Sequence, residues 1–293
     1  LNFISKNFAW VYVVFMLLFV IFCLWLAFSR FGSIRLGPDD SKPQYNTISW
    51  FAMLFCAGMG VGLVFWGISE PLSHYVSPAA GIEPGSQEAA AFAIRSCFMH
   101  WGVHPWAAYG IIGIGLAYFQ FRKNRPGLIS SLFEPMLGEK GVKGPAGKAI
   151  DIFSVIVSIA GVAASLGMGA LQICGGLNYL WGLPNNATVW LIVIVVICCI
   201  YLISATSGLE KGVKVLSNFN LCLAAVFLIL SFLFGPSVRI LEIFTTGLGD
   251  YVTHFISDSL NLEPFGDNAW FLDWRVFYWA WWIAWAPFCG QFC

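Results

Sequence analysis

The chain alternates between long stretches without charged side chains and short charged segments. Six stretches contain no Asp, Glu, Lys or Arg, and they cover residues 7–29, 43–69, 96–121, 152–209, 215–238 and 276–293. About 20 apolar residues cross a bilayer as a helix, so the stretch at 152–209 accommodates two spans and each of the others one. The pattern predicts seven transmembrane helices, at about residues 8–29, 48–69, 96–121, 150–173, 188–208, 215–235 and 274–293.

The composition agrees with a membrane protein and excludes other classes. Hydrophobic residues make up 59% of the chain and charged residues 10%, which excludes a water-soluble fold with a charged surface. Fifteen Lys and Arg balance fifteen Asp and Glu, so the basic surplus that a nucleic-acid-binding protein needs is missing. We therefore expect an all-α integral membrane protein that has the lipid bilayer, and no nucleic acid, as a partner.

The cysteines and histidines predict neither a disulfide framework nor a metal site. The nine cysteines lie mostly in apolar segments, where they act as small hydrophobic residues, and no Cys-x-x-Cys pair occurs. The four histidines, His74, His100, His104 and His254, are too scattered for a zinc site without help from folding. We expect no cofactor, no structural metal and no catalytic residue.

The basic residues predict the orientation of the chain in the membrane. Eleven of the fifteen Lys and Arg lie in the first, third and fifth connections, whereas the connections at 70–90 and 175–188 have none. By the positive-inside rule the basic side is cytoplasmic, so we expect a multi-pass protein of a bacterial inner (plasma) membrane. Because the chain begins at Leu1 rather than Met and ends at Cys293 inside an apolar run, we expect a fragment with spans before and after it.

Two connections are long enough to contain structure of their own. In the inner connection, the amphipathic segment Leu128–Leu137 is expected to lie along the membrane surface. In the outer connection, Val238–Phe244 and Tyr251–Leu260 are expected to form two interfacial helices, broken by Gly247 and Gly249.

Several polar or helix-breaking residues lie near the outer ends of the spans. Pro105 is expected to kink the third span. Glu70, directly before Pro71, is interpreted as an interfacial residue at the outer end of the second span. His100 and His104 are expected to hydrogen-bond locally, with a proton relay as the alternative.

Three alternating glycines, Gly58, Gly60 and Gly62, lie near the middle of the second span. Glycine costs a helix about 1 kcal/mol relative to alanine, so three in five positions favour local unwinding. An unwound segment exposes backbone groups at membrane depth, where they must bind a ligand or pair internally. Close helix packing through Gly58-x-x-x-Gly62 explains the same pattern equally well.

Aromatic residues gather in the third and the last span. Tyr278, Trp281, Trp282 and Trp285 follow the spacing of one helical face, and the third span contains Trp106 and Tyr109 three residues apart. Interfacial aromatic belts explain one or two tryptophans per span end, but not the four tryptophans within residues 279–285. We therefore predict an aromatic pocket shared by the two spans.

Such a pocket favours a particular ligand chemistry. Trp faces attract a cation within about 6 Å of the ring. Because no acidic residue lies within residues 58–62, 101–109 or 279–288, the aromatic π density would have to replace a carboxylate. A quaternary ammonium has no N–H to donate and suits this environment best. A ligand carboxylate could bind the backbone N–H groups of the unwound glycines, so a zwitterionic trimethylammonium compound fits both halves.

These motifs together resemble one known family. Gly58-Met59-Gly60-Val61-Gly62 followed by Glu70-Pro71, the stretch 100–109 and the stretch 277–282 closely resemble the betaine/choline/carnitine transporter family. The loop 31–40 and the segment 165–172 belong to the likeness, which runs from about Trp10 to the end of the chain. The resemblance implies a single transporter domain over 1–293 with a leucine-transporter-like inverted-repeat fold. It also implies a homotrimer and seven of twelve helices, family helices two to eight.

Carried over residue by residue, the resemblance also implies a site. The expected substrate-binding residues are Trp101, Trp106, Tyr109, Trp281, Trp282, Trp285, Ala57 and Met59. Trp282 is expected to make the direct cation–π contact, and Gly58, Gly60 and Gly62 to form the unwound helix. The expected ligands of a coupling sodium ion are Ala57, Met59, Ser158 and Phe288.

One departure affects the coupling ion. Sodium-coupled members of the family place two hydroxyls one turn apart where this chain has Ser158 and Val162. Valine cannot ligate sodium, so a proton is the alternative coupling ion, although the regular Gly-x-Gly-x-Gly form resembles the sodium-coupled betaine importers.

The expected function is sodium-coupled uptake of a quaternary-ammonium or related zwitterionic compatible solute, with glycine betaine first, by alternating access. The alternatives are a proton-coupled choline importer and a carnitine/betaine exchanger. Alternatives from other classes are an integral-membrane transferase enzyme and a passive channel.

Overall fold

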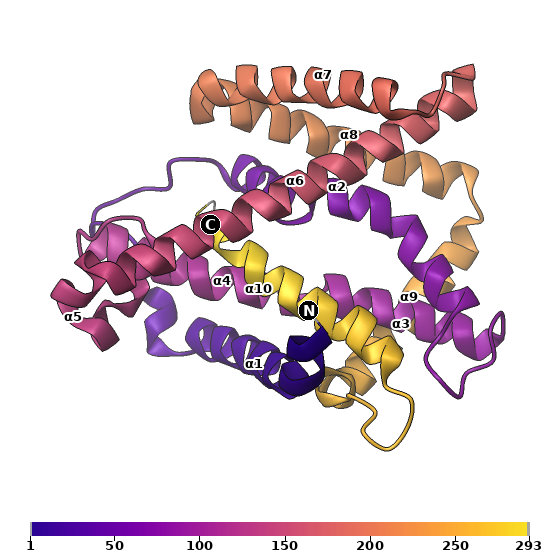
Figure 1. The fold of residues 1–293 in the computed structure, drawn as a ribbon, viewed down its shortest axis with the longest axis horizontal. Helices are drawn as coiled ribbons and strands as arrows, with labels where there is room; N and C mark the ends of the chain where they lie inside the picture. The colour runs from indigo at the N-terminus through magenta and orange to yellow at the C-terminus, as the bar shows by residue number, and fades with distance from the viewer. Residues whose placement is uncertain (1, 292–293) are drawn as a thin grey trace. The chain divides into compact units, whose positions relative to one another are not determined.

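The computed structural model describes residues 2–291, without the side chains of residues 2, 5, 59, 61, 209 and 210. All regular elements in this part of the chain are helices (Figure 1). They fall into two compact units, which are described separately. Unit 1 contains the N-terminal residues up to Lys42, Ser69–Ser158 and the residues from Val238 onward, and unit 2 contains Pro43–Ile68 and Ile159–Ser237.

Four helices of the described part of the chain, or five if a bent pair is counted as one span, have the length and composition of membrane spans. Within residues 2–291 they are Lys6–Phe28, Pro145–Trp181, Ala187–Thr206, Lys211–Phe234 and, if its two halves form one span, the bent pair Thr47–Gly58 and Gly62–Val76. The other two expected spans, 96–121 and 274–293, contain shorter helices that do not meet this length. The all-helical membrane architecture is thus confirmed, whereas the total of seven spans and the inverted-repeat topology stay predictions.

Three helices form the centre of unit 1. Helix α4 (Val103–Ala117) packs against both α1 (Asn2–Phe28) and α10 (Phe277–Gly290), and α1 also contacts α10. In Figure 1, α10 (yellow) lies along α4 (magenta). Small residues bring α4 and α10 together, because a Cβ built on Gly290 would lie 2.9 Å from the backbone nitrogen of Gly113.

The third predicted span is broken before its proline rather than kinked at it. Helix α3 (Gln87–Trp101) ends at Gly102, and α4 begins at Val103, so Pro105 lies in the first turn of a new helix. The first N–H groups of a helix have no intrahelical acceptor, so a proline costs little there. The break separates Trp101 from the rest of the expected aromatic stretch and puts it on the other helix.

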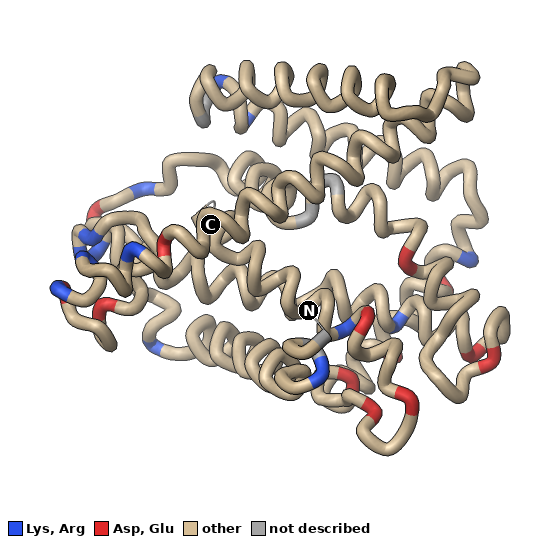
Figure 2. The backbone as a smooth tube through the Cα atoms, in the orientation of Figure 1, with Lys and Arg blue, Asp and Glu red and all other residues tan. Residues whose placement is uncertain are grey.

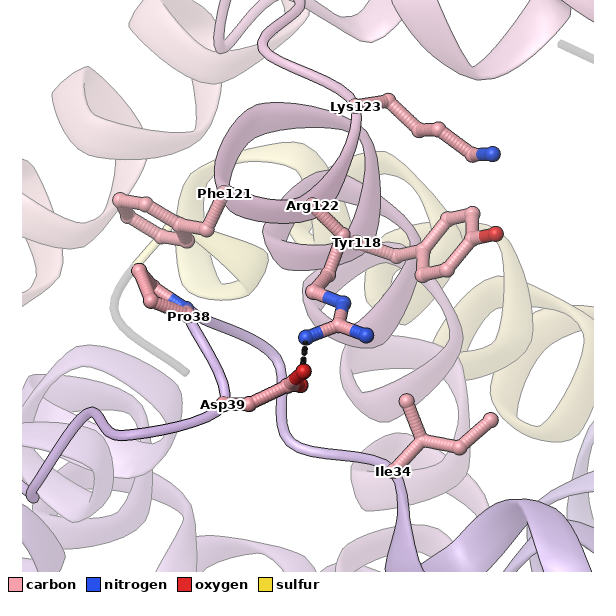
Figure 3. A pocket seen from close by; sticks show the side chains of 7 residues that line it. All are labelled: Ile34, Pro38, Asp39, Tyr118, Phe121, Arg122 and Lys123. Carbon is pink, nitrogen blue, oxygen red and sulfur yellow. Dashed lines mark hydrogen bonds and ion pairs between the residues drawn. The ribbon is translucent and has the colours of Figure 1, made fainter.

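Charged residues connect the ends of the unit 1 helices on the predicted cytoplasmic side. Two short helices follow the spans here: η1 (Arg30–Ser33) after α1, and the π-helical turn η2 (Tyr118–Arg122) after α4. Arg122 donates hydrogen bonds to the Gly37 carbonyl at 2.9 Å and to the Asp39 carboxylate at 2.5 Å. Figure 3 shows this ion pair in a surface pocket lined by Ile34, Pro38, Asp39, Tyr118, Phe121, Arg122 and Lys123. The first and third connections therefore lie on the same side of unit 1, as the charge pattern predicts.

The inner connection folds into η3 (Ile129–Phe133) and α5 (Glu134–Lys143) before α6 (Pro145–Trp181) begins. Ser130 anchors it, because its backbone N–H and its hydroxyl both donate to the Asp151 carboxylate on α6 at 2.8 Å. Figure 2 shows Lys and Arg (blue) gathered around α5 and the loop after α1, while the middles of α1, α4 and α10 are free of charge. Whether this connection lies on a membrane surface stays a prediction.

The ion pair between Arg122 and Asp39 predicts a dependence on pH. The hydrogen bond and positive charge of Arg122 hold the pKa of Asp39 below its usual value. A lowered pKa stabilises the fold at pH values above the unfolded-state pKa, about 3.9, and this stabilisation is lost as the pH falls through the folded-state pKa. We expect Asp39→Asn to lower the midpoint temperature of thermal unfolding slightly at pH 6, and the difference from the parent chain to vanish as the pH falls through the lowered pKa of Asp39. A difference between the variant and the parent that persists at low pH would contradict the ion pair. At pH 6, added salt should reduce this difference, because Asp39 is exposed and salt screens exposed charges.

The outer connection contains one long helix where the sequence predicted two. Helix α9 (Ser237–Leu260) runs without interruption through Gly247 and Gly249, so the expected break is wrong. The reason is packing: a Cβ on Gly247 would lie 2.5 Å from Ile94 and 3.1 Å from Phe98. Gly247 therefore permits close contact with α3, and packing against α3 compensates for its low helix propensity.

An ion-pair network fixes α9 to α3 at the same place. Arg95 on α3 bonds the Asp250 carboxylate at 3.1 Å and the Asp258 carboxylate at 2.9 Å. After α9 the chain enters the π-helical segment η5 (Phe271–Val276), which continues into α10. Arg275 of η5 is buried and donates to the Asp258 carbonyl at 2.5 Å. The predicted outer side of unit 1 is thus built from α3, α9 and η5.

Unit 2 contains the glycine-rich span. It comprises most of α2 (Thr47–Val76), most of α6, and α7 (Ala187–Thr206), η4 (Leu209–Val213) and α8 (Lys214–Phe234). Asn218 of α8 donates to the Ser49 hydroxyl of α2 at 3.1 Å, and Lys214 lies 5.5 Å from the Tyr45 ring centre. These contacts join the beginning of α2 to the beginning of α8.

Candidate aromatic binding site

Trp282 lies at the centre of an aromatic cluster in unit 1. Its ring centre is 5.0 Å from Trp101, 5.2 Å from Trp281, 5.6 Å from Tyr278 and 6.2 Å from Tyr109. The indole is 2% exposed, and its N–H donates to the His100 carbonyl at 2.8 Å. This bond joins α10 to the last turn of α3 and holds the indole in one orientation.

The cluster combines three helices. Trp101 comes from α3, Tyr109 from α4, and Tyr278, Trp281 and Trp282 from one face of α10, as the 0, 3, 4 spacing predicts. Trp101 and Tyr109 meet Trp282 with interplanar angles of 72° and 88°, whereas Trp281 stacks on it at 17°. Both arrangements are favourable for aromatic rings. Four of the six expected aromatic residues, Trp101, Tyr109, Trp281 and Trp282, are therefore brought together.

The other expected aromatic residues are at the edges of this cluster. Trp106 contacts Tyr109 with ring centres 5.7 Å apart, so it extends the cluster along α4. Trp285, one turn beyond Trp281, lies with its ring centre 4.7 Å from Phe288. Phe288 was expected near the coupling ion, and Ser158 lies half-buried on α6. The assignment of these residues to substrate or ion stays a prediction.

The glycine-rich segment is broken, as one of its two interpretations predicts. Helix α2 departs from helical geometry at Gly60, and its halves Thr47–Gly58 and Gly62–Val76 are bent by 58°. Among the described residues, a Cβ on Gly60 would meet no atom within 4 Å. Close packing therefore does not require a glycine at Gly60. The packing interpretation concerned Gly58 and Gly62, and it stays an alternative.

Only part of the expected backbone site can be described. Ala57 is half-buried at the end of the first half of α2, and Gly58 is buried. The side chain of Met59 lies outside the described residues. Beyond the break, Gln172 of α6 donates to the Val64 carbonyl at 3.2 Å. This bond joins a side chain of α6 to the backbone of α2 just after the bend.

A buried carboxylate touches the aromatic cluster, and the sequence reasoning missed it. Glu70 on α2 is 0% exposed, so its side chain faces protein groups rather than the surface. Its Oε2 atom accepts hydrogen bonds from the Trp101 indole and from the Tyr278 hydroxyl, both at 2.5 Å. Its Oε1 atom lies 2.6 Å from His100 Nδ1 and 3.2 Å from His74 Nε2. A carboxylate thus lies at the edge of rings that were expected to work without one.

The hydrogen bonds determine how the two histidines are protonated. An indole N–H can only donate, and the Trp270 indole lies 3.3 Å from His74 Nδ1. His74 Nδ1 is therefore the acceptor, and Nε2 carries the hydrogen that His74 donates to Glu70. The Nε2 atom of His100 is buried without a hydrogen-bond partner among the described residues. Its Nδ1–H therefore donates to Glu70. His104 lies 2.9 Å from the hydroxyl of Ser259 on α9.

Glu70, His74 and His100 also form a possible metal-ligand set, because one ligand atom from each lies within 4.8 Å of the others. Folding has thus supplied the proximity that the sequence lacked. The outer contact of His74 argues against a metal, because a metal-bound histidine needs an acceptor for its other N–H. Here that nitrogen faces an indole donor. The donor set fits a hydrogen-bond network better than a metal centre.

A local signal for this network was present in the sequence. Glu70 and His74 are four residues apart, which puts them on the same face of a helix. The partners from α3 and α10, and Trp270 before η5, could not be read from any local pattern. The stacking of His100 on Tyr278, with ring centres 4.5 Å apart, likewise depends on how these helices pack.

Comparison with known proteins identifies the family. A family model described as the betaine/carnitine/choline family transporter matches residues 1–293. The glycine betaine transporter OpuD of Bacillus subtilis is 49% identical over 292 residues, which cover 99% of this chain and 57% of the relative. A probable glycine betaine transporter of Desulfitobacterium hafniense is 46% identical over 289 residues, covering 99% of this chain and 57% of the relative.

A third relative has a different named substrate. The ectoine/hydroxyectoine transporter of Virgibacillus pantothenticus is 42% identical over 292 residues, which cover 99% of this chain and 58% of that protein. The chain thus spans a little under three fifths of the length of these curated relatives. The family is one of membrane transporters and not of enzymes, and its model covers every residue. The chain belongs to the betaine/carnitine/choline family of transporters.

Proposed function

We propose that the protein containing this chain takes up a zwitterionic compatible solute, with glycine betaine as the first candidate. The cluster of Trp101, Tyr109, Trp281 and Trp282 around one buried indole carries this proposal, because electron-rich rings from three helices converge there. Two relatives that are named as glycine betaine transporters support the choice of glycine betaine.

The chemistry of the cluster favours a quaternary ammonium over a primary amine. A primary ammonium needs acceptors for its N–H groups, and the oxygens of Glu70 are already occupied by four donors. A trimethylammonium needs no acceptor and gains about 2 kcal/mol or more from a desolvated Trp face. The carboxylate of the solute would bind backbone N–H groups of the segment broken at Gly60.

We further propose alternating access driven by an ion gradient, in a trimer embedded in the bilayer. Sodium is the first candidate ion, bound by Ala57, Met59, Ser158 and Phe288. Val162 supplies no hydroxyl one turn after Ser158 and is 42% exposed, so a proton is the runner-up. Exchange of carnitine for betaine is the alternative transport mode.

Uptake of radiolabelled glycine betaine by cells that express a full-length transporter containing this chain tests the proposal. We expect accumulation against the gradient that stops when N-methylglucamine replaces sodium. Uptake without sodium that follows the proton gradient would overturn sodium coupling but not the substrate, and equilibration without accumulation would indicate a channel. Unlabelled ectoine, choline and carnitine are added as competitors of labelled betaine. If ectoine alone competes strongly, ectoine would replace betaine as the first candidate substrate.

A further inference from the structure

We propose that Glu70 is a positioning residue for the aromatic site: its ionised carboxylate holds the Trp101 and Tyr278 rings in the orientation that recognises the substrate. The effect that this inference predicts on transport rests on the proposed function. It assigns Glu70 no contact with substrate, and it differs from the interpretation of Glu70 as an interfacial residue.

The first support is the number and direction of the hydrogen bonds. Each carboxylate oxygen has two partners: His74 and His100 at Oε1, and Trp101 and Tyr278 at Oε2. His74 and Trp101 act only as donors here, one on each oxygen. An ionised carboxylate accepts from all four. A proton on either oxygen would have to turn Tyr278 or His100 from donor into acceptor, so the charged form is the one that satisfies all four donors.

The second support is the position of the two rings that Oε2 holds. Trp101 belongs to α3 and Tyr278 to α10, and one oxygen atom binds both at 2.5 Å. Trp101 then meets Trp282 edge-on at 5.0 Å, and Tyr278 stacks on Trp281 at 6.0 Å with an interplanar angle of 16°. Glu70 therefore sets the angle between rings of two helices without occupying a ring face.

The third support is the completeness of the shell around the carboxylate. His74 is fixed in turn by Trp270 at 3.3 Å, and His100 by its stacking on Tyr278 at 4.5 Å. Glu70, His74 and His100 are each fully buried, so water does not compete for these bonds. A buried carboxylate that has two partners on each oxygen is held in one orientation, which is the property that a preorganised binding site needs.

Glu70→Gln is the sharpest test, because it keeps the shape and removes two acceptor sites. In one orientation the new amide NH₂ faces the Trp101 N–H, and in the other it faces the His74 Nε2–H. Neither donor can become an acceptor while Trp270 fixes His74. A side chain of the same size therefore leaves a donor against a donor whichever way it turns.

The experiment compares Glu70→Gln with Glu242→Gln in a full-length transporter containing this chain. Glu242 is an exposed residue of α9 that pairs with Arg239, so it controls for loss of a carboxylate. We expect Glu70→Gln to raise the KM for betaine uptake about tenfold or more, with surface expression unchanged and a smaller effect on Vmax. Glu242→Gln should behave as the parent. A parental KM in Glu70→Gln would overturn the inference.

Two further measurements keep the test decisive. If Glu70→Gln does not fold, Tyr278→Phe removes only one of the four donors, and it should raise the KM severalfold; a parental KM of Tyr278→Phe would count against positioning.

Near-ultraviolet circular dichroism of the purified proteins reports the packing of the stacked rings independently of transport. Glu70→Gln should change this spectrum and Glu242→Gln should not. If the parent itself takes up no betaine, the proposed function fails, and an unchanged spectrum of Glu70→Gln would separately overturn the positioning role.

Discussion

Trp282→Ala is expected to raise the KM for betaine uptake at least about 30-fold, because a desolvated cation–π contact with Trp contributes about 2 kcal/mol or more. Trp282 is the ring with the most partners in the cluster, since Trp101, Tyr109, Tyr278 and Trp281 all contact it. Trp282→Phe keeps a ring but loses the indole N–H that bonds the His100 carbonyl. The KM of Trp282→Phe should lie between that of the parent and that of Trp282→Ala.

The neighbouring Trp279 offers a matched control on the same helix. It is fully buried, stacks on His104 with ring centres 4.8 Å apart, and its indole nitrogen has no hydrogen-bond partner among the described residues. Trp279→Phe therefore removes the same group from α10 without breaking a hydrogen bond. We expect it to retain uptake with a parental KM. Equal losses in Trp279→Phe and Trp282→Phe would indicate a packing defect and contradict a specific role for Trp282.

Gly290→Ala is expected to lower the free energy of unfolding by about 1–3 kcal/mol, the range found when a methyl group is forced into a packed interior. The new Cβ would lie 2.9 Å from the Gly113 backbone nitrogen and 2.8 Å from the Ile112 side chain. A backbone atom cannot move aside as a side chain can, so α10 would have to separate from α4. These helices carry Trp282 and Tyr109, and uptake should fall together with stability.

Gly249→Ala is the control for this prediction. Gly249 lies within α9, and among the described residues a Cβ there meets no atom within 4 Å. Alanine favours a helix over glycine by about 1 kcal/mol, so this change should be neutral or stabilising. For both variants, the midpoint temperature of unfolding is measured in detergent from the loss of helicity and of monodispersity. A parental midpoint for Gly290→Ala would contradict the close approach of α4 and α10.

Some features of the site followed from local pattern. The spacing of Tyr278, Trp281 and Trp282 predicted a common helical face, and the three rings are in mutual contact. The glycines predicted a weak point in the second span, and α2 departs from helical geometry at Gly60. In each case the physical cause acts over a few residues: the helical repeat for the aromatic face, and the low helix propensity of glycine for the break.

Other features were misjudged because local pattern does not contain them. Gly247 reads as a helix breaker, but the close approach of α3 makes it a packing residue within a continuous α9. Glu70 reads as an interfacial residue, because it is the first charge after a long apolar stretch. Its burial depends on donors that lie 4, 30, 31 and 208 residues away along the chain.

The sequence by itself determined the class of protein: the absence of charge over bilayer-length stretches reflects the low polarity of lipid, and each stretch responds to that solvent independently. It also determined the family, because each glycine or aromatic motif lies within a few consecutive residues and can be read locally. Only the tertiary structure decided that a carboxylate lies at the edge of the aromatic rings. A buried charge is tolerated where several donors meet it, and those donors come together only when α2, α3 and α10 pack.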